Sequence, residues 1–179
     1  MRRREERRED RHDGPGPAGG GKVHYQMRQK MVSIGDDYWI ENDRGEKVFK
    51  IDGKALRVRQ TLVFEDRNGH ELFKIQEKML RIKDSMEIED AHGARVAMVK
   101  KALITPIRER WSVDIRGQKD LEVQGNFLDH EYRIGNIAEV SKKWFRLRDT
   151  YGVEVDPGQD DALILAITVC VDEMAHQGK

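Results

Sequence analysis

The sequence predicts a mainly β protein, a closed antiparallel β-barrel that encloses a hydrophobic C-terminal α-helix. Three observations lead to this prediction. Glycines recur every 24 residues through the middle of the chain, apolar and polar side chains alternate between them, and one apolar run near the C-terminus has no polar face. Alternation with a period of two is typical of strands that have one dry and one wet face.

Residues 1–22 differ in composition from the rest of the chain. Arginines interleaved with Glu and Asp are followed by a stretch rich in Gly and Pro, with almost nothing to bury. Such a composition is typical of a disordered, solubilising tail. No apolar stretch follows the arginines, so we expect no secretory signal. We expect residues 23–179 to form one domain.

The glycine repeat predicts a series of β-hairpins. The turn sequences DRG, DRNG and DAHG supply residues that tolerate positive φ, as hairpin turns require. The repeated glycines, 24 residues apart, are Gly45, Gly69, Gly93 and Gly117. A fifth hairpin is expected outside this period, in the sequence WFRLRDTYGVEV (144–155).

Side chains alternate within the segments that join these turns. Phe49 and Ile51 fall on one face of a strand, and Lys50 falls on the other. The segments 55–59 and 80–83 repeat this pattern, with aliphatic residues on one face and basic residues on the other. We expect ten or more short strands over about 130 residues. That number favours closure into a barrel, because closure removes exposed strand edges.

The sequence DPGQDD precedes the apolar run and predicts the start of a helix. We expect Asp156 to cap the helix, Pro157 to take the first helical position and Gln159 to act as the capping-box partner. Asp160 and Asp161 would then lie in the first turn, where the helix dipole favours negative charge.

The apolar run Ala162–Val171 predicts that this helix, over about residues 158–176, lies inside the protein. Only Thr168 interrupts the run, and charges close it at both ends. A membrane span needs about 20 apolar residues, twice the length of this run. A helix packed on an open sheet would leave half of its apolar surface wet, at a cost of about 25 cal/mol per Å². We therefore expect the barrel to enclose the helix.

In these features the chain resembles the LURP-one-related family of the tubby C-terminal-like superfamily, which also includes the phospholipid scramblases. Two segments carry the resemblance: YWIENDRGEKVFKIDGKALRVRQTLVFEDRNGHELFKIQEKMLRIKDSMEIED (38–90) and DDALILAITVCVDEM (160–174). The resemblance covers about residues 24–176. It implies a twelve-stranded barrel around a central C-terminal helix over this range.

The resemblance also implies classes of function. Tubby-like domains are associated with phosphoinositide binding through a basic pocket, and scramblase relatives with lipid movement and calcium. LURP-one-related members mostly lack an assigned biochemical role, and plant members are linked to pathogen defence. The cysteine-rich, palmitoylated segment of the scramblases has no counterpart here, because the chain has a single cysteine, Cys170. We expect Cys170 to be a reduced core residue rather than a reactive thiol.

Motifs for catalysis are missing from the sequence, which has no glycine-rich phosphate loop, GxSxG elbow or HExxH motif. The histidines are scattered, and we find none paired at ligand spacing: His12, His24, His70, His92, His130 and His176. We therefore predict no enzyme activity, no cofactor and no metal site.

Two acidic groups flank the predicted helix. A calcium site is one interpretation of Asp156, Asp160 and Asp161, but the group lacks the ligand pattern of an EF-hand loop, and helix capping is the simpler interpretation. At the other end, we expect Asp172 and Glu173 to mark the solvated exit of the helix from the barrel.

The candidate binding surface is the basic outer face of the barrel. The candidate headgroup-binding residues alternate with aliphatic residues: Arg57, Arg59, Arg81 and Lys83. Further basic residues extend this face: Lys100, Lys101, Lys142, Lys143, Arg146 and Arg148. If these side chains converge, they can hold a phosphorylated headgroup by charge-assisted hydrogen bonds. The alternative is an ordinary exterior on which they pair with the abundant Glu and Asp.

The sequence thus predicts a non-enzymatic, monomeric, cytoplasmic protein. Its expected partners are anionic phospholipid or phosphoinositide headgroups at the membrane periphery, or another protein for which it acts as a scaffold. The alternative function is lipid transfer of the scramblase type. We expect no nucleic-acid partner, since 33 basic residues balance 33 acidic ones and no interleaved aromatic platform is present.

Overall fold

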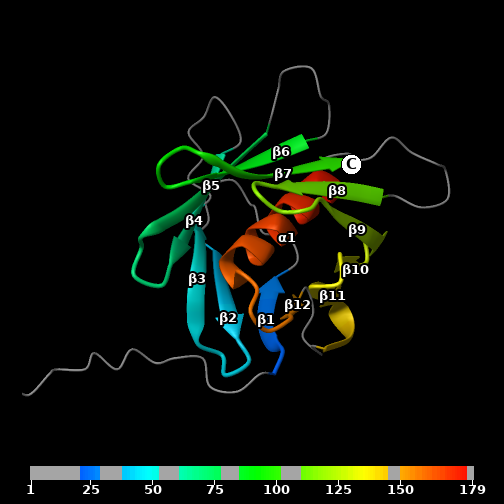
Figure 1. The fold of residues 1–179 in the computed structure, drawn as a ribbon. Coiled ribbons are helices and arrows are strands. Elements are labelled where there is room, and N and C mark those ends of the chain that lie inside the picture. The colour runs from blue at the N-terminus through cyan, green and yellow to red at the C-terminus, as the bar shows by residue number, and fades with distance from the viewer. Residues whose placement is uncertain are drawn as a thin grey trace, which may run out of the picture.

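In the part of the chain that the structure describes, twelve strands form a closed antiparallel barrel with one α-helix inside it (Figure 1). The computed structural model describes residues 21–28, 38–52, 61–77, 85–101, 110–144 and 150–176. Each strand pairs with its neighbours in sequence, and β1 pairs with β12 to close the barrel. The predicted fold class is confirmed.

The first six strands are β1 (Val23–Arg28), β2 (Tyr38–Asn42), β3 (Lys47–Asp52), β4 (Thr61–Asp66), β5 (Glu71–Glu77) and β6 (Ser85–Asp90). The next six are β7 (Arg95–Lys101), β8 (Arg110–Ile115), β9 (Leu121–Asn126), β10 (Glu131–Ile134), β11 (Ala138–Ser141) and β12 (Thr150–Val155). A short 3₁₀ helix, η1 (Lys142–Trp144), follows β11, and the chain enters the barrel as α1 (Asp161–His176).

The four predicted hairpin turns are present, each with its glycine at a φ between 74° and 83°. The first three share one hydrogen-bonded frame. In the second of them, Asp66 Oδ1 accepts bonds from the backbone N–H groups of Asn68 at 2.8 Å and His70 at 2.9 Å. Asn42 and Asp90 make equivalent bonds in the first and third turns. The bonds from His70 and Asn68 hold the pKa of Asp66 at about 2, well below its usual range.

The fifth predicted hairpin, over residues 144–155, is wrong in the part that the structure describes. Residues 150–155 form one continuous strand, β12, with Gly152 in its interior rather than in a turn. β12 pairs with β1 on one side and with β11 on the other. Gly152 therefore lies within a strand that is paired on both sides, and the turn-like sequence Thr-Tyr-Gly does not reverse the chain.

The antiparallel order gives the barrel two different ends. At the first, which we call the turn end, lie the four glycine turns and the start of α1. At the opposite end, which we call the helix-exit end, lie the last residues of α1 and the strand ends that flank residues 29–37, 53–60, 78–84, 102–109 and 145–149. The connection between β9 and β10 also lies at the helix-exit end.

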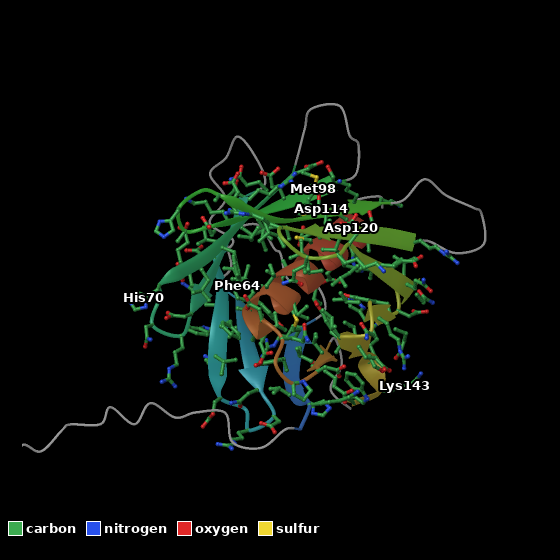
Figure 2. All side chains as sticks on the ribbon, in the orientation of Figure 1. Phe64, His70, Met98, Asp114, Asp120 and Lys143 are labelled. Atoms are coloured by element: carbon green, nitrogen blue, oxygen red, sulfur yellow. The ribbon has the colours of Figure 1, made fainter. Side chains whose placement is uncertain are left out.

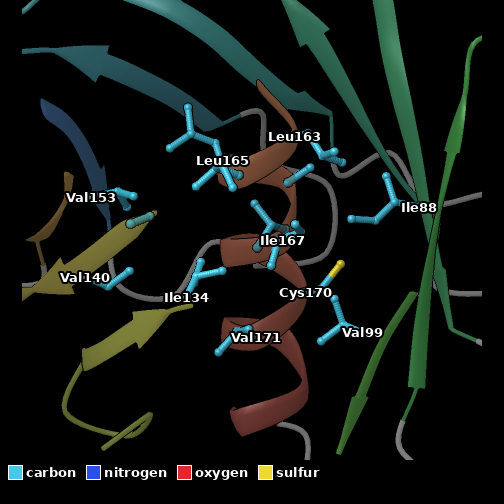
Figure 3. Close-up of a cluster of buried hydrophobic side chains, with 14 of the residues drawn as sticks. Ile88, Val99, Ile134, Val140, Val153, Leu163, Leu165, Ile167, Cys170 and Val171 are labelled. Carbon is cyan, nitrogen blue, oxygen red and sulfur yellow. The ribbon is translucent and has the colours of Figure 1, made fainter. Parts of the chain in front are cut away.

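The helix occupies the centre of the core, as predicted. Its ten residues Leu163–Asp172 are all buried, so no side of this stretch faces solvent. Figure 3 shows Ile88 and Val99 on one side of the helix and Ile134, Val140 and Val153 on the other. Cys170 is buried, and burial raises the pKa of its thiol, as expected for a core cysteine. Among the described residues, no helix has the length and apolar character of a membrane span.

The start of the helix differs from the prediction. Asp160, not Asp156, caps it: Oδ1 of Asp160 accepts a bond from the backbone N–H of Leu163 at 3.0 Å. Gly158 has a φ of 80°, which a helical residue cannot adopt, so Pro157 and Gln159 belong to a turn before the helix. The predicted roles of Asp156, Pro157 and Gln159 in helix capping are therefore wrong.

Replacing the cap tests this assignment. Asp160→Ala is expected to lower the free energy of unfolding by about 1 kcal/mol, since the first turn loses a side-chain acceptor. Asp156→Ala removes a carboxylate four residues upstream of the cap and should change the free energy of unfolding by less than about 0.5 kcal/mol. Urea denaturation followed by circular dichroism measures both. A larger effect from the Asp156 variant would restore the earlier assignment.

Candidate functional site

The candidate headgroup-binding residues Arg57, Arg59, Arg81 and Lys83 lie outside the described residues, as do Arg146 and Arg148. The strand ends that flank the first four are described. Residues 53–60 follow β3 and precede β4 in the sequence, and residues 78–84 follow β5 and precede β6; the strand ends that flank both segments lie at the helix-exit end. Thr61 pairs with Gln76, and Glu77 pairs with Met86, so these strand ends are neighbours on the barrel rim.

Charge is distributed unevenly between the sequence segments that join the strands. Residues 53–60 and 78–84 contain six basic residues and one acidic residue. The matching turns at the opposite end, residues 43–46 and 67–70, contain two Arg and two acidic residues. The excess of positive charge thus falls in two sequence segments whose flanking strand ends, on β4 and β5, are neighbours at the helix-exit end.

The described part of the exterior is largely salt-bridged. Lys143 Nζ lies 3.1 Å from a carboxylate oxygen of Glu131, and Lys100 Nζ lies 3.8 Å from Asp114. Figure 2 shows Lys143 and His70 pointing away from the barrel, on an outer surface covered with polar side chains. On these described strands the exterior matches the alternative in which basic and acidic residues pair with each other.

The three carboxylates proposed for calcium have separate partners. Asp160 caps the helix, and Asp161 accepts a 2.5 Å hydrogen bond from the hydroxyl of Tyr25. Asp156 lies 3.5 Å from Lys22 Nζ. These contacts fit the interpretation that the three carboxylates have structural roles rather than a shared role in calcium binding.

A second polar cluster, which the sequence analysis missed, lies at the helix-exit end. It consists of His130, Asp172 and His176, and we call it the His–Asp–His cluster. His130 Nε2 lies 2.5 Å from Asp172 Oδ1, and both side chains are almost fully buried. His176 Nδ1 lies 2.8 Å from the backbone oxygen of Asp172 and 3.5 Å from its Oδ1. Each of the three residues offers one atom that can bind a metal ion, and these three atoms lie within 4.8 Å of one another.

Two elements place these side chains. Asp172 and His176 stand one turn apart on α1, which carries Asp172 into the barrel interior. The predicted solvated position of Asp172 is therefore wrong. His130 ends the connection between β9 and β10, with a φ of 51°, the only positive value of a described residue other than glycine. Asn126 and Asp129 hold this connection through two mutual hydrogen bonds.

Aromatic rings complete the surroundings of the cluster. The ring of Tyr151 stacks on His130 with centroids 4.2 Å apart, and the His176 ring lies 5.6 Å from that of His130. His130 Nδ1 and the hydroxyls of Tyr132 and Tyr151 are buried without hydrogen-bond partners. Burial, with the nearby charge of Asp172, raises the pKa of both phenols well above the ordinary value.

Glu173, the residue after Asp172, also has a shifted pKa. Burial, followed by the charge of Asp172, raises the pKa of Glu173 to about 7. Among the described residues, neither Asp172 nor Glu173 has a Lys or Arg partner. The side chains in polar contact with Asp172 at the end of the helix are therefore the two histidines.

One part of this cluster had a signal in the sequence. Asp172 and His176 are spaced i, i+4 on a predicted helix, which places them on one face. Nothing in the local sequence connects them to His130, which lies 42 positions before Asp172. The scattered spacing of the histidines along the chain gave no sign that the rings of His130 and His176 lie 5.6 Å apart.

Comparison with known proteins gives a match to a family model and matches to solved structures. The family model described as LURP-one-related matches residues 23–172. A solved X-ray structure of a protein from Arabidopsis thaliana aligns with a TM-score of 0.63 and 18% identity, over 86% of this chain and 91% of that one. At that identity the similarity shows the fold. Among curated proteins, no sequence matches this chain.

Proposed function

We infer the function from a premise: this chain belongs to the LURP-one-related family, whose model spans residues 23–172. We propose that it is a non-enzymatic binding protein that holds anionic phospholipid headgroups, phosphoinositides among them, at the helix-exit end of the barrel. The observation that supports this proposal is the composition of residues 53–60 and 78–84, six basic residues and one acidic residue, together with the described strand ends of β4 and β5 beside them, which are neighbours at the helix-exit end.

The chemistry of these residues suits a phosphorylated headgroup. Arginine presents a planar fork of donors that matches phosphate oxygens, and lysine adds a point charge. Each basic residue near an anionic membrane surface contributes about 1 kcal/mol, and salt screens this attraction within a Debye length. We therefore expect binding that weakens steeply as ionic strength rises.

Sedimentation with liposomes tests this proposal. Detergent-free protein is mixed with vesicles of phosphatidylcholine alone, or with added phosphatidylserine or phosphoinositide, at low and physiological salt. Binding is expected only to the charged vesicles. The variant with Arg57, Arg59, Arg81 and Lys83 replaced by Gln should bind at least tenfold more weakly, from the loss of about 1 kcal/mol per residue at the surface.

The turn end supplies a matched control. Its exposed turns also hold three arginines and one lysine: Arg44, Arg67, Arg116 and Lys119. Replacing these four by Gln changes the net charge by the same amount, and binding should stay at the wild-type level. Equal losses in the two variants would show that only net charge matters. Absence of binding by the wild type at either salt would overturn headgroup binding and leave the scaffold role.

A further inference from the structure

We propose that the His–Asp–His cluster is a binding site for one divalent transition-metal ion of the zinc class, with His130, Asp172 and His176 as its ligands. This proposal does not depend on headgroup binding. Imidazole nitrogen and carboxylate oxygen are ligands that Zn²⁺ takes in proteins, and three protein ligands leave a fourth position for water or another ligand.

The distances within the cluster are close to those that a metal requires. Ligand bonds of about 2.0–2.1 Å in a tetrahedral arrangement place ligand atoms about 3.3 Å apart. Asp172 Oδ1 and His176 Nδ1 already lie 3.5 Å apart. Asp172 Oδ1 and His130 Nε2 lie 2.5 Å apart. They need to move apart by less than about 1 Å to reach the tetrahedral separation of about 3.3 Å. The ligand nitrogens of His130 and His176 lie within 4.8 Å of each other, so these two rings must also move closer together. His176 Nδ1 gives up its 2.8 Å hydrogen bond to the backbone oxygen of Asp172 when it binds the ion.

Charge at the cluster favours a cation. Asp172 is buried, and a buried carboxylate is costly unless a positive group compensates it. Glu173 adds a second carboxylate at the same end of the helix, and among the described residues no Lys or Arg contacts either of them. A divalent cation between the two imidazoles and Asp172 supplies this compensation.

The surroundings hold the first ligand in place. His130 adopts a left-handed backbone conformation, which is uncommon for residues other than glycine and tends to occur at functional positions. Its ring is fixed by stacking on Tyr151. Buried polar atoms without partners also gather here: His130 Nδ1 and the hydroxyls of Tyr132 and Tyr151. Such atoms are rare in proteins, and an ion with its bound water is one way to satisfy them.

The cluster is reachable from solvent through its third ligand. The side chain of His176 is 35% exposed, whereas those of His130 and Asp172 are 0% and 3% exposed. His176 lies in the last turn of α1, at the helix-exit end. A metal ion can therefore enter past His176 without unfolding the barrel. The competing interpretation is a purely structural His–carboxylate pair with His176 beside it.

Calorimetric titration of the metal-free full-length chain with Zn²⁺ separates these interpretations. We expect one ion to bind per chain. His176→Ala removes the rim ligand and leaves the buried pair intact, so it should fold normally and bind at least tenfold more weakly. His24→Ala is the matched control, because His24 forms a surface His–carboxylate pair with Glu154 at the opposite end, at 2.7 Å. It should bind as the wild type does.

A second variant tests the carboxylate. Asp172→Asn keeps the shape of the side chain but removes its charge, and Zn²⁺ affinity should again fall at least tenfold, with folding checked by circular dichroism. Co²⁺ bound to the wild type should give the visible absorption of a tetrahedral site, and the His176 variant should lose it. No Zn²⁺ binding by the wild type, or unchanged affinity in His176→Ala, would overturn the metal site.

Discussion

Leu165→Ala is expected to lower the free energy of unfolding by about 2–5 kcal/mol, because it removes the Cγ atom and both Cδ methyl groups from the centre of the barrel and leaves a cavity. Leu165 is fully buried on α1 and belongs to the cluster of apolar side chains in Figure 3. Strands surround the helix, and a closed sheet cannot easily collapse onto a missing side chain. Urea denaturation measures the loss, which is a large fraction of a typical total of about 5–15 kcal/mol.

The same substitution on the surface provides the control. Leu128 lies in the connection between β9 and β10 and is 44% exposed. Leu128→Ala should change the free energy of unfolding by less than about 0.5 kcal/mol. If the two variants lost stability equally, α1 would not be enclosed by the barrel, and the central claim about the fold would fail.

The barrel and its helix could be predicted because their signals are local and repeated. Each glycine turn fixes a reversal, and the alternation of residues such as Phe49, Lys50 and Ile51 fixes which face is buried. The ten buried residues of α1 form one continuous stretch, so their need for enclosure is visible in the sequence. No long-range information is needed for any of these steps.

The start of the helix was mispredicted because two cap signals overlap. Asp156-Pro157 resembles a helix start, and so does Asp160-Asp161 four residues later. Gly158 decides between them, since its φ of 80° reverses the chain before the helix begins. The sequence shows that this residue is a glycine, but whether it takes positive φ depends on how the chain turns from β12 into the barrel.

The His–Asp–His cluster could not be predicted because it depends on a contact between distant segments. His130 reaches Asp172 only when β9 and β10 end at the rim where α1 leaves the barrel. The basic residues of 53–60 and 78–84 illustrate the opposite case. Their chemistry was apparent in the sequence, and the strand pairing adds that their connections begin on neighbouring strands.

Gly125→Ala is expected to cause the other large loss of stability, about 3 kcal/mol or more, from backbone strain and overpacking together. Gly125 lies in β9 opposite Tyr132 of β10, with a φ of 145°. A Cβ at this position would lie 2.3 Å from the backbone oxygen of Glu131 and 2.5 Å from Cα of Tyr132. Both contacts are with the backbone of the neighbouring strand, so the strands would have to separate.

Gly45→Ala separates strain from collision. Gly45 also has a positive φ, 74°, but a Cβ there would meet nothing within 4 Å. Its replacement should cost only about 1–2 kcal/mol, the penalty of the left-handed conformation. Urea denaturation of both variants gives the difference, and equal losses would rule out the close approach of β9 and β10. Because β9 and β10 carry the connection that ends in His130, the Gly125 variant should also bind Zn²⁺ more weakly, whereas the Gly45 variant, at the turn end, should not.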